Sequence, residues 1–187
     1  SFVMNEHGTL IGRDSIRFER LLPGPIERVW AYLVEPDKRA LWLAGGPMTL
    51  APGGAVALQF RNAELSRNDD QAPEKYRAIE NCGNAHGKVV ACEPPHRLVF
   101  TWGDAPNMTA SESSEVEVVL APEGDRVRLT LKHRRLEPDA MSSVGAGWHT
   151  HIGILQDRME GRQPRPFWRT HTTLEAEYIE RLRTYQH

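Results

Sequence analysis

The sequence contains few cysteines, and this scarcity excludes several kinds of site. Among 187 residues only Cys82 and Cys92 are cysteines, and nine residues separate them. This is neither the C-x-x-C spacing of a redox pair nor half of a zinc site. A chain of this length buries about 70% of its unfolded surface and needs no disulfide or metal to hold it together. The two thiols favour a reducing compartment, so we expect a cytoplasmic protein.

Long apolar runs and an excess of one charge are also lacking. No segment approaches the roughly 18 apolar residues that span a membrane, and the first residues show no signal-peptide pattern. The formal net charge is −2, from 23 Lys and Arg against 25 Asp and Glu. Nucleic-acid binding needs a surplus of Lys and Arg. We therefore expect neither membrane insertion nor a nucleic-acid partner.

Motifs for cofactors, nucleophiles and metals are missing as well. The chain has no G-x-G-x-x-G after a predicted strand, no P-loop and no G-x-S-x-G. His149 and His151 form an H-x-H pair, but residues i and i+2 of a helix point about 200° apart and cannot share one ion. We expect no cofactor and no metal site, and we assign no catalytic residue.

What the sequence does contain is a series of alternating apolar and polar segments, which predict strands. These segments are residues 14–22, 55–61, 88–92, 97–102, 115–120 and 126–131. The last two flank a Pro-Glu-Gly-Asp turn and predict a hairpin. Because the alternate positions are polar, the sheet should have one dry face. The polar stretch between residues 62 and 85 predicts a surface loop.

Helical periodicity predicts two short helices after the first strand, near residues 25–34 and 36–45, and two longer ones near the C-terminus. The first long helix follows Pro138 and ends at Gly161. It contains Gly145, Gly147 and Gly153, each of which weakens a helix by about 1 kcal/mol relative to alanine. Such glycines indicate either close packing or space for a bound ligand.

The last helix, after Pro166, carries an apolar stripe. It should therefore pack on its own domain or on another subunit, which would give a homodimer.

Two charged groups predict solvated surface. His133, Arg134 and Arg135 form a basic run at a strand end, where charge discourages edge pairing. Asp157 and its charged neighbours lie near the end of the long helix and predict a solvated rim.

This order of elements predicts an α+β helix-grip fold, in which a curved antiparallel sheet of about six to seven strands wraps around a long C-terminal helix. We divide the chain into a lead-in at 1–13, a domain at 14–161, and a linker with an additional C-terminal helix at 162–187. A sheet curved around a single helix leaves a cleft between them, where small molecules bind.

Three motifs within residues 14–161 resemble a known superfamily. The helix sequence PIERVWAYL at 25–33 resembles the opening helix of the START-related (SRPBCC) superfamily. The sequence EPPHRLVFTW at 93–102 resembles its central EPPxRLxFTW hairpin. Gly147-Trp148 is similar to the GW of the branch of homologues of the activator of the 90-kDa heat-shock protein ATPase. The resemblance implies the helix-grip fold, and members include carriers of hydrophobic ligands, polyketide cyclases and a domain of a chaperone activator.

Aromatic residues on the inner faces predict either pocket walls or packed core. Trp148 is the strongest candidate for a wall, because Gly145 and Gly147 beside it leave room. His151 lies at the margin of the helix stripe, where it is either an acid or base in the pocket or a hydrogen-bonded structural histidine. The candidate ligand-binding residues are Trp30, Phe60, Phe100, Trp102, Trp148, His151, Ile152 and Leu155.

These features favour a non-catalytic module that binds a small hydrophobic molecule between the sheet and the long helix. One alternative is an enzyme of the polyketide cyclase or aromatase kind, in which His151 is the acid or base. Another is a regulator of the chaperone ATPase, or another protein-interaction domain, acting through the outer sheet face or the last helix. The chain has no room for the separate N-terminal domain of the eukaryotic activator, which counts against a chaperone partner.

Overall fold

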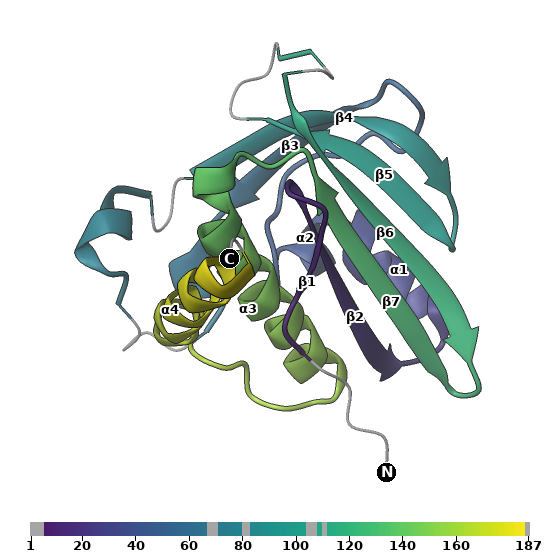
Figure 1. Ribbon diagram of the computed structural model, residues 1–187. Helices are drawn as coiled ribbons and strands as arrows, with labels where there is room; N and C mark the ends of the chain where they lie inside the picture. The colour runs from purple at the N-terminus through teal and green to yellow at the C-terminus, as the bar shows by residue number, and fades with distance from the viewer. Residues whose placement is uncertain (1–5, 67–70, 80–82, 104–107, 110–111, 186–187) are drawn as a thin grey trace.

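The strands form one antiparallel sheet that curves around the C-terminal helices (Figure 1). The computed structural model describes residues 6–66, 71–79, 83–103, 108–109 and 112–185. Across these residues the sheet has seven strands in the order β1-β2-β7-β6-β5-β4-β3. Their bounds are β1 Thr9–Ile11, β2 Ser15–Pro23, β3 Ala55–Phe60, β4 Gly83–Glu93, β5 Arg97–Trp102, β6 Ser114–Glu123 and β7 Arg126–Arg134.

The helices include a long one, α3, that lies between the sheet and the last helix, α4 (Figure 1). The α-helices are α1 Ile26–Val34, α2 Pro36–Arg39, α3 Met141–Met159 and α4 Phe167–Tyr185, and the short 3₁₀ helices are η1 Asn62–Glu64, η2 Glu74–Ile79 and η3 Pro138–Ala140. This arrangement confirms the predicted α+β helix-grip fold. No helix in the described part of the chain has the length and apolar character needed to cross a membrane.

The hairpin of β6 and β7 shows how the alternation of the sequence builds the core. Val118 on β6 lies opposite Leu131 on β7, and Gly124 adopts a φ of 64° in the turn between the strands. That backbone conformation favours glycine, which has no Cβ to clash. The inward side chains of β6 and β7 are all buried: Val116, Val118, Leu120, Val127, Leu129 and Leu131. The predicted dry face is therefore the face that forms the core.

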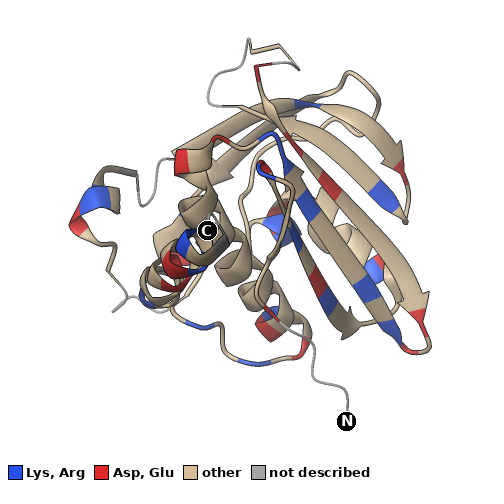
Figure 2. Ribbon diagram, viewed as in Figure 1, with Lys and Arg blue, Asp and Glu red and all other residues tan. Residues whose placement is uncertain are grey.

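The outer face of the sheet carries charges of both signs. Figure 2 shows acidic residues along β6 beside basic residues along β7. Arg97 Nε donates to Glu117 Oε2 at 2.8 Å, and Arg128 Nε donates to Glu123 Oε1 at 2.6 Å. Exposed pairs of this kind contribute little to stability, about 0–1 kcal/mol each. The negative charges of β6 therefore face the positive charges of β7 across the outer surface of the sheet.

The N-terminal segment and α4 both dock on the domain. Residues 9–11, which fall within the predicted lead-in, form β1 and pair with β2. The apolar stripe of α4 packs on α3 of the same chain, with Phe167, Trp168 and Tyr178 buried. A homodimer, which the stripe also allowed, stays a prediction.

Part of the predicted loop at 62–85 is anchored on α4. Tyr76 in η2 stacks on Trp168 with ring centroids 5.4 Å apart, and its hydroxyl donates to Glu175 Oε2 at 2.6 Å. Leu65 is buried as well. Residues 67–70 and 80–82, including Cys82, lie outside the described residues. The anchored part of this loop therefore covers one side of α4.

The predicted solvated rim at the end of α3 is wrong for Asp157, which is buried. Its carboxylate accepts from Arg165 Nε at 2.9 Å, from Arg165 Nη2 at 3.0 Å and from the Arg165 backbone N–H at 3.0 Å. Arg162 Nη2 adds a fourth bond at 3.2 Å. Although burial opposes it, this set of donors lowers the pKa of Asp157. The carboxylate ties the end of α3 to the segment that leads into α4.

Candidate functional site

A small cavity lies between α3 and the inner face of the sheet. Its volume is about 110 Å³. Strands β3, β5 and β7, the segment after α2, and the first half of α3 contribute its walls. The lining residues are Leu43, Phe60, Trp102, His133, Val144, Gly147, Trp148 and His151. We call this space the α3–sheet cavity.

The structure brings part of the predicted binding set to this cavity. Phe60, Trp102, Trp148 and His151 line it. The other predicted residues lie elsewhere in the fold. Trp30 is half-buried on α1 and packs against the core, Phe100 is buried beside Trp102, and Ile152 and Leu155 are fully buried in the core.

The aromatic walls pack against one another edge to face or at a tilt. Trp102 lies 5.5 Å from Trp148 and 5.7 Å from Phe60, measured between ring centroids. Phe60 in turn lies 5.9 Å from the ring of His151. These separations are typical of favourable aromatic pairs. The rings therefore support each other while leaving one face open to the cavity.

Four lining residues were not predicted: Leu43, His133, Val144 and Gly147. The basic run at 133–135 was predicted to be solvated, and this is wrong for His133, which is buried. The signal was present in the sequence. His133 continues the inward alternation of Leu129 and Leu131 by two residues, so the pleat of β7 directs it into the core.

A hydrogen-bond chain fixes the protonation of His133. Trp148 Nε1–H donates to His133 Nδ1 at 2.9 Å, so Nδ1 is an acceptor. The Ser114 hydroxyl donates to the Trp102 carbonyl at 3.1 Å, so its oxygen accepts the proton of His133 Nε2 at 2.7 Å. Burial lowers the pKa of His133 to about 3. The ring is neutral, and every polar atom in this series of hydrogen bonds has a partner.

The same hydrogen bonds exclude Ser114 as a nucleophile activated by His133. A general base must hold a free lone pair toward the serine hydroxyl. Here the Nε2 atom that faces Ser114 carries the proton, because Nδ1 already accepts from Trp148. The pair therefore fixes the position of Trp148 in the cavity wall and cannot abstract a proton.

His151 has one ring nitrogen free to accept a hydrogen bond. Its Nδ1 lies 2.8 Å from the Trp42 carbonyl, to which it must donate, and the neutral ring then presents Nε2 as an acceptor. No hydrogen-bond donor from the described residues occupies Nε2. Burial lowers the pKa of His151 to about 4. At neutral pH the cavity thus offers one hydrogen-bond acceptor among apolar walls.

The neighbouring His149 faces the other way. Its Nδ1 lies 2.9 Å from the Tyr178 hydroxyl on α4, whereas His151 meets Trp42 beside the sheet. This is the divergence that helical geometry predicts for residues i and i+2. Within the described residues, no three His, Cys, Asp or Glu side chains lie close enough together to hold a metal.

Two of the three glycines of α3 are explained by close packing. A Cβ on Gly145 would lie 3.1 Å from Tyr178 Cδ1 on α4. A Cβ on Gly153 would lie 2.6 Å from Nη1 of Arg165, whose guanidinium Asp157 holds in place. At both positions the absence of a side chain lets α3 approach its neighbours.

Gly147 differs from the other two, because nothing in the fold requires it to be small. Apart from its chain neighbours and its own helix backbone, no atom of the described residues lies within 4 Å of the Cβ that would be added there. Yet Gly147 lines the α3–sheet cavity, and alanine would make a better helix by about 1 kcal/mol. The packing of the chain therefore accounts for Gly145 and Gly153 but leaves Gly147 to be explained by the empty space beside it.

This difference predicts opposite results for two alanine substitutions. Gly147→Ala should raise the free energy of unfolding by up to about 1 kcal/mol, the helix-propensity gain. Gly145→Ala should lose that gain, because overpacking against Tyr178 costs about 1–3 kcal/mol. Urea denaturation of both variants and the wild type measures the difference. Equal stabilisation by both substitutions would contradict this assignment.

Comparison with known proteins agrees with the fold. The chain belongs to the family described as activator of Hsp90 ATPase homolog 1-like proteins, whose model matches residues 23–160. A search of curated proteins finds no significant match.

Solved structures of similar proteins share this fold. The protein encoded by gene BPP1335 from Bordetella parapertussis is 42% identical, with a TM-score of 0.77, over 95% of this chain and 91% of that one. CalU16 from Micromonospora echinospora is 25% identical, with a TM-score of 0.66, over 90% and 88%. The Aha1 dimer from Colwellia psychrerythraea shares the fold at 18% identity, with a TM-score of 0.55, over 78% and 96%.

Proposed function

We propose that this protein binds a small aromatic or similarly compact apolar molecule in the α3–sheet cavity. The observation that carries the proposal is Gly147, where a helix-weakening residue borders open space that no neighbouring atom fills. The aromatic walls supply apolar surface, and the partners of His133 and Trp148 hold those walls in place. A preformed pocket of this kind reduces the ordering that binding requires.

The size and polarity of the cavity narrow the class of ligand. An apolar cavity of about 150 Å³ holds one benzene, so a volume of about 110 Å³ suits no more than a single ring, and even that ring requires a small outward shift of the half-buried Phe60 or Trp102. His151 Nε2 accepts a hydrogen bond, which a hydroxyl or amine of the ligand would donate. A single-ring phenol meets both requirements. A ligand with more than one ring would need a much larger movement of these two side chains.

Acid–base catalysis by His151 is less well supported than binding. Its pKa of about 4 leaves the ring without a proton to give at neutral pH, and makes it a weak base. A chaperone partner has weaker support still, because the likeness to the Aha1 dimer shows the fold alone.

The proposal predicts that filling the cavity abolishes binding. With 4-methylphenol at ten times its dissociation constant, the wild type should gain about 1.4 kcal/mol, which raises the melting temperature by about 3–6 °C. Gly147→Leu places a side chain in the open space and should show no such rise. Gly145→Ala, which alters the other face of α3, should keep it. An equal rise in wild type and Gly147→Leu would refute the cavity as the site.

A further inference from the structure

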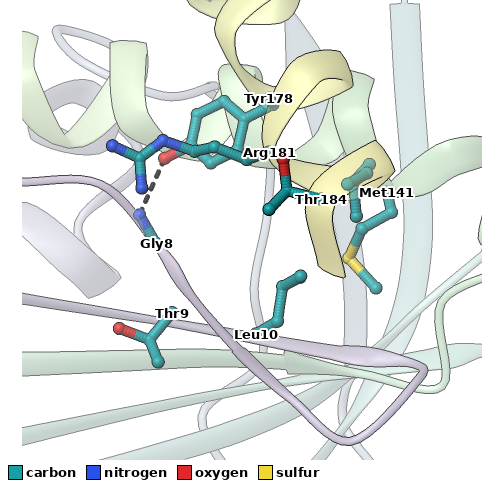
Figure 3. Close-up of a pocket in the computed structure, with 8 residues that line it drawn as sticks. Gly8, Thr9, Leu10, Met141, Tyr178, Arg181 and Thr184 are labelled. Atoms are coloured by element: carbon teal, nitrogen blue, oxygen red, sulfur yellow. Dashed lines mark hydrogen bonds between the residues drawn. The ribbon is translucent and has the colours of Figure 1, made fainter. Parts of the chain in front are cut away.

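A second and larger pocket lies between β1, α4 and the start of α3 (Figure 3). Its volume is about 510 Å³, within the range of about 300–1,000 Å³ that is usual for ligand sites. It shares no lining residue with the α3–sheet cavity. We call it the β1–α4 pocket. It is independent of the site proposed above.

The floor of the β1–α4 pocket is apolar, and hydrogen bonds fix the position of Tyr178 beside it. Leu10, Met141 and Leu182 line it, and Met141 is buried. Tyr178 presents its ring, because its hydroxyl is already engaged. That hydroxyl accepts the backbone N–H of Gly8 at 2.7 Å and lies 2.9 Å from His149 Nδ1. These bonds hold the residue before β1 against α4 at one side of the pocket.

Among the lining residues one carries a charge, Arg181, which is exposed at the edge of the pocket. Glu177, four residues earlier on α4, would be its usual helical partner, but its Oε1 lies 3.2 Å from His7 Nε2 instead. Among the described residues no carboxylate forms an ion pair with Arg181. In Figure 3 its guanidinium lies beside the Tyr178 ring, near Gly8.

The surroundings of Arg181 add to its positive charge. Burial lowers the pKa of the neighbouring His149 to about 3, and the charges of Arg20, Arg165 and Arg181 act in the same direction. Arg20 is itself buried and donates only to backbone carbonyls, of Glu19 at 2.8 Å and of Glu6 at 2.6 Å. An anion at the mouth of the pocket would meet this positive field, which the carboxylates of Glu6 beside Arg20 and Glu177 beside Tyr178 offset in part.

We propose that the β1–α4 pocket binds a single-chain amphiphile with a carboxylate head. The hydrocarbon chain lies on Leu10, Met141 and Leu182, and the carboxylate pairs with Arg181. The planar guanidinium fork matches the two oxygens of a carboxylate. A neutral or cationic head on the same chain would lack this pairing. The pocket therefore selects by charge as well as by apolar surface.

Decanoate, decanol and decyltrimethylammonium share a chain and differ in the head, so they test the proposal. We expect decanoate to bind most tightly and to shift the ¹³C-methyl resonance of Met141, assigned with Met141→Leu. Arg181→Gln should weaken decanoate binding about five- to tenfold, the usual effect of losing a charge-assisted hydrogen bond at an exposed site. Arg183→Gln is the matched control, because Arg183 is exposed on the same helix, pairs with Glu180 and does not line the pocket. That variant should bind decanoate like the wild type.

The outcomes separate this site from the α3–sheet cavity. Gly147→Leu should leave decanoate binding intact, even if the proposed function fails. Loss of decanoate binding in Gly147→Leu, with no change in Arg181→Gln, would place the molecule in the other cavity and overturn the inference. Absence of decanoate binding, or equal affinity for all three heads, would overturn it too.

Discussion

Replacing Arg39 with methionine is expected to lower the free energy of unfolding by about 3–5 kcal/mol, a large part of the usual 5–15 kcal/mol. Arg39 is buried, and its guanidinium binds four backbone carbonyls. Nε donates to Ala44 O at 3.0 Å, and Nη1 donates to Leu33 O and Val34 O, both at 3.3 Å. Nη2 donates to Gly46 O. Methionine fills a similar volume but leaves these carbonyls buried without donors.

The loss of the Arg39 hydrogen bonds should also disturb the α3–sheet cavity. Arg39 anchors the segment that contains Leu43, which lines the cavity, and Trp42, whose carbonyl orients His151. Burial lowers the pKa of Arg39 to about 10, so it stays charged at neutral pH and the charge needs these carbonyl dipoles. Arg39→Met should therefore also weaken 4-methylphenol binding.

Urea denaturation at neutral pH measures the effect of Arg39→Met. Lys38→Met is the matched control, since Lys38 is the preceding residue and is exposed, with only an exposed contact to Glu35. Surface changes of this kind usually stay within about 0.5 kcal/mol. If Arg39→Met unfolds at the same urea concentration as Lys38→Met, Arg39 does not organise this segment.

Acidification to pH 5 is expected to lower the free energy of unfolding by about 6 kcal/mol, a large part of the usual 5–15 kcal/mol. Burial lowers the pKa of His133 and His149 to about 3 and that of His151 to about 4, against 6.5 in the unfolded chain. Above pH 6.5 the rings are neutral in both states, and the stability is complete. As the pH falls from 6.5 toward 4, the unfolded chain binds protons that the folded chain does not. At pH 5 each histidine then contributes about 2 kcal/mol of destabilisation, or about 6 kcal/mol together.

Urea midpoints at pH 7.5, 6 and 5 test this dependence. These three histidines should give a slope of unfolding free energy against pH of about three protons near pH 5, and burial lowers the pKa of His171 as well, which adds to the slope. His151→Asn keeps a donor for the Trp42 carbonyl and removes one titrating group, so its slope should fall by about one proton. A midpoint that does not change between pH 7.5 and 5 would show that these histidines accept protons in the folded protein.

The sequence predicted the fold well because the strands and helices follow simple periodicities. Alternation at 115–120 and 126–131 predicted both the hairpin and its buried side chains, and the structure confirms them. The same rule extended by two residues would have placed His133 inside. The neighbouring arginines suggested an exposed position instead. A run of basic residues, taken as a unit, does not show that successive side chains of a strand point to opposite faces.

The site was predicted only in part, because it depends on contacts between distant elements. Phe100 and Trp102 lie two residues apart on one face of β5, yet only Trp102 reaches the cavity. Asp157 looked like a solvated charge because its partner, Arg165, lies in the next segment of the chain. For the glycines of α3 the sequence offered close packing or ligand space. In the structure Gly145 is closely packed, whereas Gly147 lies beside open space.

The α3–sheet cavity as a binding site is tested most directly by ¹⁵N NMR of the tryptophan indole groups during a titration with 4-methylphenol. Trp102 and Trp148 line the cavity, whereas Trp42 is buried away from it with its Nε1–H bonded to Tyr32 O at 2.8 Å. The proposal predicts saturable shifts of the Trp102 and Trp148 signals, little change at Trp42, and loss of all these shifts in Gly147→Leu. Unchanged signals of Trp102 and Trp148 at saturating 4-methylphenol, or the same shifts in Gly147→Leu, would contradict it.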